Sequence, residues 1–233
     1  QRQMCIRDRF GIPVYIRPSF WVVLAIFGGA LSISSVEDLI YPALFVIAGF
    51  VAILSHEMGH ALVGRKLGGG QQTIVLELFG GLTSSHGMQL TRGGRALMIL
   101  AGPMMTLLLG IISLGLTWNI VAPVMTSYNL NFWDLAISPF TAALISPKLY
   151  ILSCLIMIGE WWTILNLLPI YPLDGGQLIA QYIRSPRKVF MTGFITAILI
   201  GLLSFQLFHG YFIPIFMALF AYSNYREYKN APF

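Results

Sequence analysis

The stretch His56-Glu57-Met58-Gly59-His60 follows an apolar run, Leu39 to Ser55, that contains no charged residue. Two histidines four residues apart on a helix project from the same face, about 6 Å apart along the helix axis. This spacing suits two corners of a tetrahedral metal site, and it places the carboxylate of Glu57 beside the metal as a base. Ionisable groups at membrane depth are costly, so the stretch predicts hydrolytic metal chemistry inside or at the edge of a bilayer.

The composition is that of an integral membrane protein. The chain has 233 residues, of which 57% are hydrophobic and 10% charged, whereas a soluble domain carries about 25% charged residues. The charges separate apolar runs and form no basic stripe, so the net charge of +5 does not indicate nucleic acid. We therefore expect a protein embedded in the lipid bilayer, with no nucleic-acid partner.

Apolar runs of the length needed to cross the ~30 Å hydrocarbon layer predict the fold class. This class is an all-α polytopic membrane protein with about six transmembrane helices, and the candidate spans are residues 18–36, 39–64, 95–117, 149–168, 189–208 and 210–225. The last two meet near His209-Gly210, and no charge separates them, which favours a tight helical hairpin.

A short β hairpin is expected between the second and third spans. Residues 73–79 are rich in β-branched and apolar side chains, and Gly80-Gly81 follows them. This segment is too apolar to be freely solvated. Extended backbone is tolerated at membrane depth only where it lies within the protein's own cavity, so we expect the hairpin to be membrane-associated.

The basic residues predict the orientation in the membrane. With six spans and the N-terminus inside, thirteen of the fourteen Lys and Arg residues are cytoplasmic, and Lys148 alone is outside. This bias predicts a multi-pass protein of the cell membrane with both termini in the cytoplasm. It also places the His56–His60 turn toward the cytoplasmic side.

A catalytic zinc site takes three protein ligands and keeps one open position, so a third ligand is needed. The candidates near the cytoplasmic half of the membrane are Glu77, His86, Glu160 and Asp174. Asp174 stands out by its setting, because Pro169 and Pro172 break the preceding span and turn the chain inward. A role for Asp174 as the N-cap of a helix over 175–183 is the structural alternative.

These motifs resemble the site-2 protease family of intramembrane zinc metalloproteases. His56-Glu57-x-x-His60 is similar to the family's first motif, and Asn166-x-x-Pro169-x-Tyr171-Pro172-x-Asp174-Gly175-Gly176 to its second. Weaker likenesses are found at Phe10-Gly11-Ile12-Pro13, Phe79-Gly80-Gly81 and Ala101-Gly102-Pro103. We expect residues 10–228 to form a single transmembrane metalloprotease domain, a minimal member without a PDZ or regulatory domain. Residues 1–9, which do not begin with Met, are expected to be incomplete or foreign.

The resemblance implies that His56, His60 and Asp174 bind one Zn²⁺ ion per chain and that Glu57 is the general base. It implies that Asn166 binds the substrate backbone, and that the chain cleaves transmembrane segments of single-span membrane proteins by metal-activated water. Regulation by a separate membrane protein is compatible with it. Two other functions are open, a membrane metal-binding or transport protein and an inactive relative that binds transmembrane partners. A transporter spreads polar residues along several helices, whereas here they gather at one depth, and an intact Glu57 argues against inactivity.

Overall fold

The computed structural model describes residues 4–7, 11–78, 80–128 and 138–232. The chain divides into two compact units, Gln1–Thr163 and Ile164–Phe233, and each is described by itself. Phe10, Phe79 and most of the segment 1–9, on which the sequence analysis makes predictions, lie outside the described residues.

A four-stranded sheet lies in the first unit, with the strand order β1-β2-β3-β4. The strands are β1 (Met4–Arg7), β2 (Pro13–Ile16), β3 (Gln71–Glu77) and β4 (Gly80–His86). β3 and β4 form an antiparallel hairpin in which Gln71 faces His86 and Glu77 faces Gly80. β2 runs parallel to β3, with Val14 opposite Ile74, so the connection between them crosses over through two helices.

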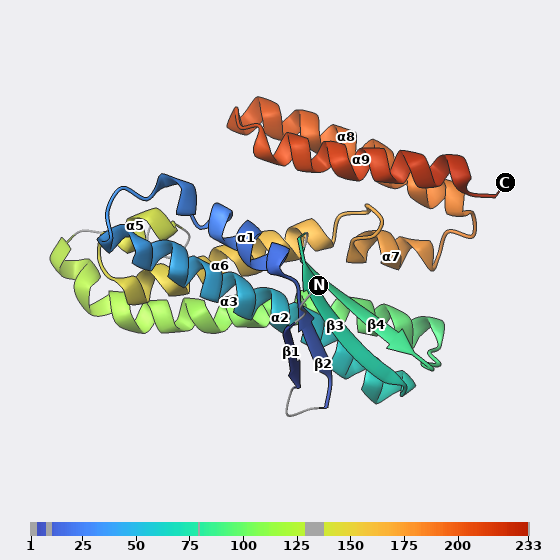
Figure 1. Ribbon diagram of the computed structural model, residues 1–233, viewed down its shortest axis with the longest axis horizontal. Helices are drawn as coiled ribbons and strands as arrows, with labels where there is room; N and C mark the ends of the chain where they lie inside the picture. The colour runs from blue at the N-terminus through green and yellow to red at the C-terminus, as the bar shows by residue number, and fades with distance from the viewer. Residues whose placement is uncertain (1–3, 8–10, 79, 129–137, 233) are drawn as a thin grey trace. The chain divides into compact units, whose positions relative to one another are not determined.

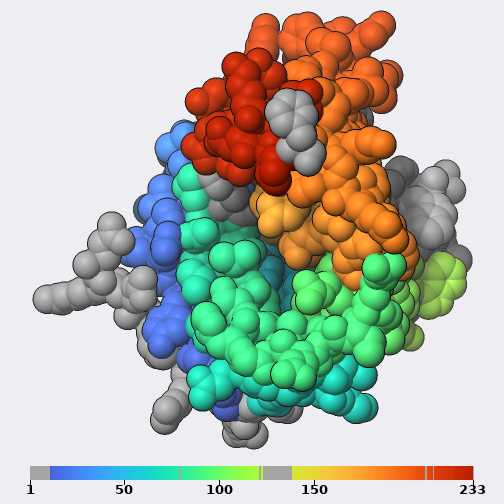
Figure 2. Space-filling view, turned by 90° about the vertical axis from the view of Figure 1, so that its right-hand side faces the viewer, coloured from blue at the N-terminus to red at the C-terminus, as the bar shows by residue number. Residues whose placement is uncertain are grey.

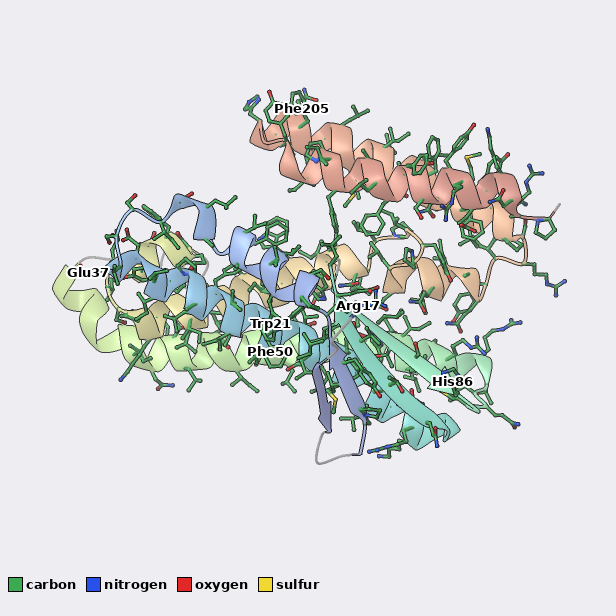
Figure 3. All side chains as sticks on the ribbon, viewed as in Figure 1. Arg17, Trp21, Glu37, Phe50, His86 and Phe205 are labelled. Atoms are coloured by element: carbon green, nitrogen blue, oxygen red, sulfur yellow. The ribbon has the colours of Figure 1, made fainter. Side chains whose placement is uncertain are left out.

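One face of this sheet builds the core of the first unit. Side chains alternate across a strand, so Gln72, Ile74 and Leu76 of β3 are all buried on the same side. Ile74 and Leu76 pack in one cluster with Phe20 and Leu24 of α1 (Pro18–Phe27). At its rim, the rings of Trp21 on α1 and Phe50 on α2 (Ile40–Gly68) are 5.3 Å apart (Figure 3).

Three long helices complete the first unit: α2 (Ile40–Gly68), α3 (Arg92–Tyr128) and α6 (Pro147–Asn166), whose last turn enters the second unit. The short α5 (Pro139–Ala143) precedes α6. α2 and α3 lie side by side (Figure 1). The hydroxyl groups of Thr106 on α3 and Thr163 on α6 are hydrogen-bonded at 2.9 Å.

The second unit contains α7 (Asp174–Ala180), α8 (Pro186–Phe208) and α9 (Phe212–Asn230). α8 and α9 form the predicted hairpin, and His209 in the left-handed conformation, at φ 49°, ends α8. Ala197 of α8 packs with Met217 and Ala221 of α9 and with Ile170, which precedes α7.

Four helices among the described residues are long and apolar enough to cross a membrane: Glu37–Gly68, Arg92–Ile120, Pro147–Asn166 and Pro186–Leu207. They coincide with four of the six predicted spans, and the protein is a multi-pass membrane protein. The sixth predicted span corresponds to α9.

The observed fold differs from the expected one at two places. The helix expected over 18–36 ends at Phe27, because Gly28 and Gly29 follow and Gly29 adopts a φ of 86°. Two short 3₁₀ turns, Ala30–Ser32 and Glu37–Leu39, occupy the rest of the path to α2. The β structure is also larger than an isolated hairpin, since β1 and β2 extend it to four strands.

Candidate metal centre

The turn from His56 to His60 is buried within the first unit. His56 is 2% exposed, Glu57 5% and His60 7%, and Met58 and Gly59 between them are also buried. They lie in the second half of α2, on the part of the helix that faces α3 and β4. A polar group buried this deeply needs a partner.

The two imidazoles converge on one point. Their Nε2 atoms are 3.1 Å apart, and the rings are nearly perpendicular, at 82°. The Nδ1 atom of His60 lies 2.8 Å from the carbonyl oxygen of Met98 on α3. A carbonyl only accepts hydrogen bonds, so Nδ1 of His60 carries the hydrogen and its Nε2 presents a lone pair. A hydrogen bond from the ring nitrogen that does not bind the metal is the arrangement that orients metal-binding histidines.

The histidine pair fits a zinc ion. Tetrahedral ligands at 2.0–2.1 Å from zinc are about 3.3–3.4 Å from one another, and the two Nε2 atoms are within a few tenths of an ångström of that separation. Gly102 of α3 leaves room beside them, because a Cβ atom there would contact Nε2 of His60 and lie 2.9 Å from Nε2 of His56. A side chain at residue 102 would therefore collide with the histidine pair.

Glu57 is held against β4. Alternate residues of a strand share a face, and Gly81 and Thr83 both face α2 at Glu57. A Cβ atom at Gly81 would collide with the carboxyl group of Glu57, so the backbone of β4 contacts the acid directly. The hydroxyl of Thr83 is 2.8 Å from Oε2 of Glu57 and 3.1 Å from its main-chain carbonyl oxygen. Figure 2 shows the face of this unit on which the β3–β4 hairpin and the start of α3, turquoise to green, lie side by side.

Asp174 and Asn166 belong to the second unit. Asp174 is 6% exposed and Asn166 9%. The helix α7 begins at Asp174, and its N-cap position is occupied by Leu173, so the N-cap role considered for Asp174 is not observed. Its carboxylate stands in the first turn of a helix, where the helix dipole favours negative charge.

A buried asparagine holds the loop that precedes Asp174. Asn224 of α9 is 1% exposed, and its Nδ2 atom donates to the carbonyl oxygen of Tyr171 at 2.6 Å and to that of Phe220 at 2.9 Å. Asn224 is not among the residues that the sequence motifs single out. The signal that could have identified it is its position: Asn224 is a side-chain amide that follows the uncharged, mostly apolar stretch from Phe212 to Ser223.

The other candidate ligands have different surroundings. Glu77 forms an ion pair with Arg17 at the start of α1, and His86 is exposed at the far end of β4, away from Arg17 (Figure 3). Glu160 is exposed on α6. None of these three is buried, whereas the candidate ligands His56, His60 and Asp174 are.

Comparison with known proteins identifies the class to which this fold and site belong. Residues 44–208 match peptidase family M50, which is more than half of the chain. A zinc metalloprotease of Methanocaldococcus jannaschii is 29% identical over 223 residues, 91% of this chain and 56% of that relative. The solved structure of a site-2 protease from Methanocaldococcus jannaschii covers 97% of this chain and 95% of its own, with a TM-score of 0.61 and 22% identity. At that identity the likeness shows a shared fold.

The chain therefore belongs to peptidase family M50, and the resemblance to site-2 proteases that its motifs indicate is confirmed. The chain spans about half the length of the curated relatives it matches, 56% and 42% for the first two.

Proposed function

We propose that this protein is an intramembrane zinc metalloendopeptidase that cleaves the transmembrane segments of membrane proteins. The observation that carries the proposal is the pair of Nε2 atoms 3.1 Å apart, with Glu57 between the two histidines, on a helix long and apolar enough to span a membrane. Membership of a peptidase family supports hydrolysis as the chemistry.

His56, His60 and Asp174 are the proposed zinc ligands. Each offers one ligand atom and each is buried, and two imidazoles with one carboxylate are a donor set typical of catalytic zinc. When bound, zinc lowers the pKa of a water molecule and polarises the peptide carbonyl. Asp174 is the ligand that the second sequence motif supplies, and it brings the negative charge that two neutral imidazoles lack.

Glu57 is the proposed general base. Glu57 follows His56 in the sequence, and its carboxylate is held against β4. In this role the carboxylate takes a proton from the attacking water and delivers it to the leaving amine. Burial at 5% exposure keeps the carboxylate apart from bulk solvent. The step needs no other acid or base from the chain.

The substrate we propose is a single-span membrane protein whose helix unwinds locally, since helical carbonyls are otherwise sequestered in hydrogen bonds. The unwound segment would add to an edge strand of the sheet. β4 is an edge strand, whereas β3 is paired on both sides, so β4 is the strand to which we propose that the substrate pairs. We propose that Asn166 hydrogen-bonds the substrate backbone.

The test is a proline scan of β4 from Leu82 to Ser85. Successive N–H groups of an edge strand point alternately toward the neighbouring strand and toward the open edge. Proline at the positions whose N–H faces the open edge should impair cleavage and leave bound zinc unchanged. If all four variants cleave as the wild type does, edge pairing is wrong.

The proposed orientation keeps both termini and the metal centre toward the cytoplasm. The basic residues Arg65 and Lys66, which end α2 one turn after His60, support it. Cysteine labelling from the two sides of sealed vesicles, at Arg65→Cys and at Lys148→Cys, tests it. We expect modification from the cytoplasmic side at 65 and from the opposite side at 148.

The decisive experiment reconstitutes the purified protein in liposomes with single-span substrates. Glu57→Gln should abolish cleavage and retain zinc, and Glu37→Gln, the same change at an exposed site, should cleave normally. Metal flux without cleavage would instead identify a transporter. Stable substrate binding without cleavage in the wild type would identify an inactive relative.

A further inference from the structure

Glu57 is a flexible side chain, and the structure shows what holds it. A glutamate has three rotatable side-chain torsions, and restricting them costs conformational entropy. A general base works only when its oxygen is held in reach of the proton that it takes. The contacts of the carboxylate with β4 are therefore part of the catalytic geometry.

Two residues of β4 confine the carboxylate from different sides. The backbone at Gly81 lies against Cγ, Cδ and Oε1 of Glu57, and the hydroxyl of Thr83 lies 2.8 Å from Oε2. Leu82 between them is 52% exposed and points to the other face of the strand. Gly81 limits where the group can go, and Thr83 supplies the directional contact.

We propose that Thr83 is a positioning residue for the general base, a role that rests on the proposed peptidase function. An ionised carboxylate only accepts hydrogen bonds, so the hydroxyl of Thr83 donates to Oε2 of Glu57. Such a charge-assisted hydrogen bond is about twice as strong as a neutral one. Thr83 thereby leaves the other carboxylate oxygen, Oε1, to act on water.

The same hydroxyl serves Glu57 after it has accepted the proton. A hydroxyl has one hydrogen and two lone pairs, so it bonds one of its two acceptors at a time. Once Oε1 has taken the proton, Oε2 remains an acceptor and the hydroxyl of Thr83 can continue to donate to it, with the main-chain carbonyl oxygen of Glu57 as the alternative acceptor 3.1 Å away.

The kinetic test compares Thr83→Val, which keeps the shape and removes the hydroxyl, with Thr83→Ser, which keeps the hydroxyl. We expect Thr83→Val to lower kcat by about 10- to 100-fold with KM and zinc content unchanged. Thr83→Ser should remain within about threefold of the wild type. Thr73→Val, the same substitution on β3, is the matched control and should leave kcat unchanged. Wild-type kcat in Thr83→Val, or an equal loss in Thr83→Ser, overturns the proposal.

A double-mutant cycle on thermal unfolding tests the contact without any reference to activity. The midpoint is measured for the wild type, Thr83→Val, Glu57→Ala and the double variant of the zinc-loaded protein. The main-chain carbonyl of residue 57 is present in all four, so the cycle isolates the side-chain contact. Thr83→Val should lower the midpoint more when Glu57 is present than when it is alanine, and equal lowering overturns the proposal. If the cycle gives a positive coupling but the wild-type protein cleaves no substrate, the proposed peptidase function is wrong and the contact between Thr83 and Glu57 is still supported.

Discussion

The Nδ1 atom of His60 lies 2.8 Å from the carbonyl oxygen of Met98. This hydrogen bond joins α2, which carries both histidines, to the first part of α3, and it determines which ring nitrogen of His60 presents a lone pair. Four residues further along α3, Gly102 lies against the Nε2 atoms of both histidines. α3 thus orients the ring of His60 and approaches both Nε2 atoms without a side chain.

Gly102→Ala should abolish zinc binding. The added methyl group would collide with Nε2 and Cε1 of His60 and lie 2.9 Å from Nε2 of His56. Helix propensity alone would favour alanine by about 0.8–1.0 kcal/mol, so the loss cannot come from the helix itself. Zinc content by elemental analysis is the measurement. Gly115→Ala, on the same helix with nothing within 4 Å of the new Cβ, should retain zinc.

Gly81→Ala should separate catalysis from metal binding. Its methyl group would collide with the carboxyl group of Glu57 and displace the base, while the histidine ligands are untouched. Since a displacement of about 1 Å can cost 10²-fold in rate, we expect cleavage to fall by about that factor with zinc retained. Leu82→Ala on the opposite face of β4 is the control. Loss of zinc in Gly81→Ala would show that β4 supports the ligands and not the base.

Asn224→Ala should weaken both the fold of the second unit and zinc affinity. It removes the donor to the carbonyl of Tyr171, three residues before Asp174, and an unsatisfied buried acceptor costs about 1–3 kcal/mol. Thermal unfolding with and without added zinc measures both effects. Asn230→Ala, exposed at the end of α9, should change neither. Unaltered zinc affinity in Asn224→Ala would mean that the loop keeps its position without this hydrogen bond.

Removing the metal should lower stability reversibly. Because a ligand that binds only the folded state stabilises it by RT ln(1 + [L]/Kd), zinc at 100 times its Kd contributes about 2.7 kcal/mol. We expect a chelator to lower the unfolding midpoint of the wild type, and zinc to restore it. His56→Ala and Asp174→Ala should show no such response. An Asp174→Ala variant that responds as the wild type does would exclude this carboxylate as a ligand.

The parts of the fold that local patterns determine could be predicted from the sequence. The apolar runs around Ile53 and Ala197 marked helices, and the paired glycines after Glu77 marked the hairpin of β3 and β4. The spacing of His56 and His60 placed both rings on one face of α2, and the structure brings their Nε2 atoms together.

The parts that depend on contacts distant in sequence were not predictable. β2 pairs with β3 across about sixty residues, Val14 with Ile74, and no local pattern specifies such pairing. The contact of Thr83 with Glu57 also joins different elements. A threonine in a strand usually indicates β propensity only, so nothing in its neighbours marked it as a partner of the acid.

The parallel pairing of β2 with β3 connects residues 13–16 to the surroundings of Glu57, because β3 pairs with β4 and β4 contacts the carboxyl group of Glu57. Trimming the protein up to Arg17 would remove β1 and β2, expose the flank of β3 and uncover Ile74 and Leu76. Only the β3–β4 hairpin, which contacts Glu57, would then remain of the sheet, and an isolated two-stranded hairpin is at best marginally stable. Shortened or fused versions prepared for laboratory work should accordingly keep residues 13–16, because β2 supports the hairpin that contacts Glu57.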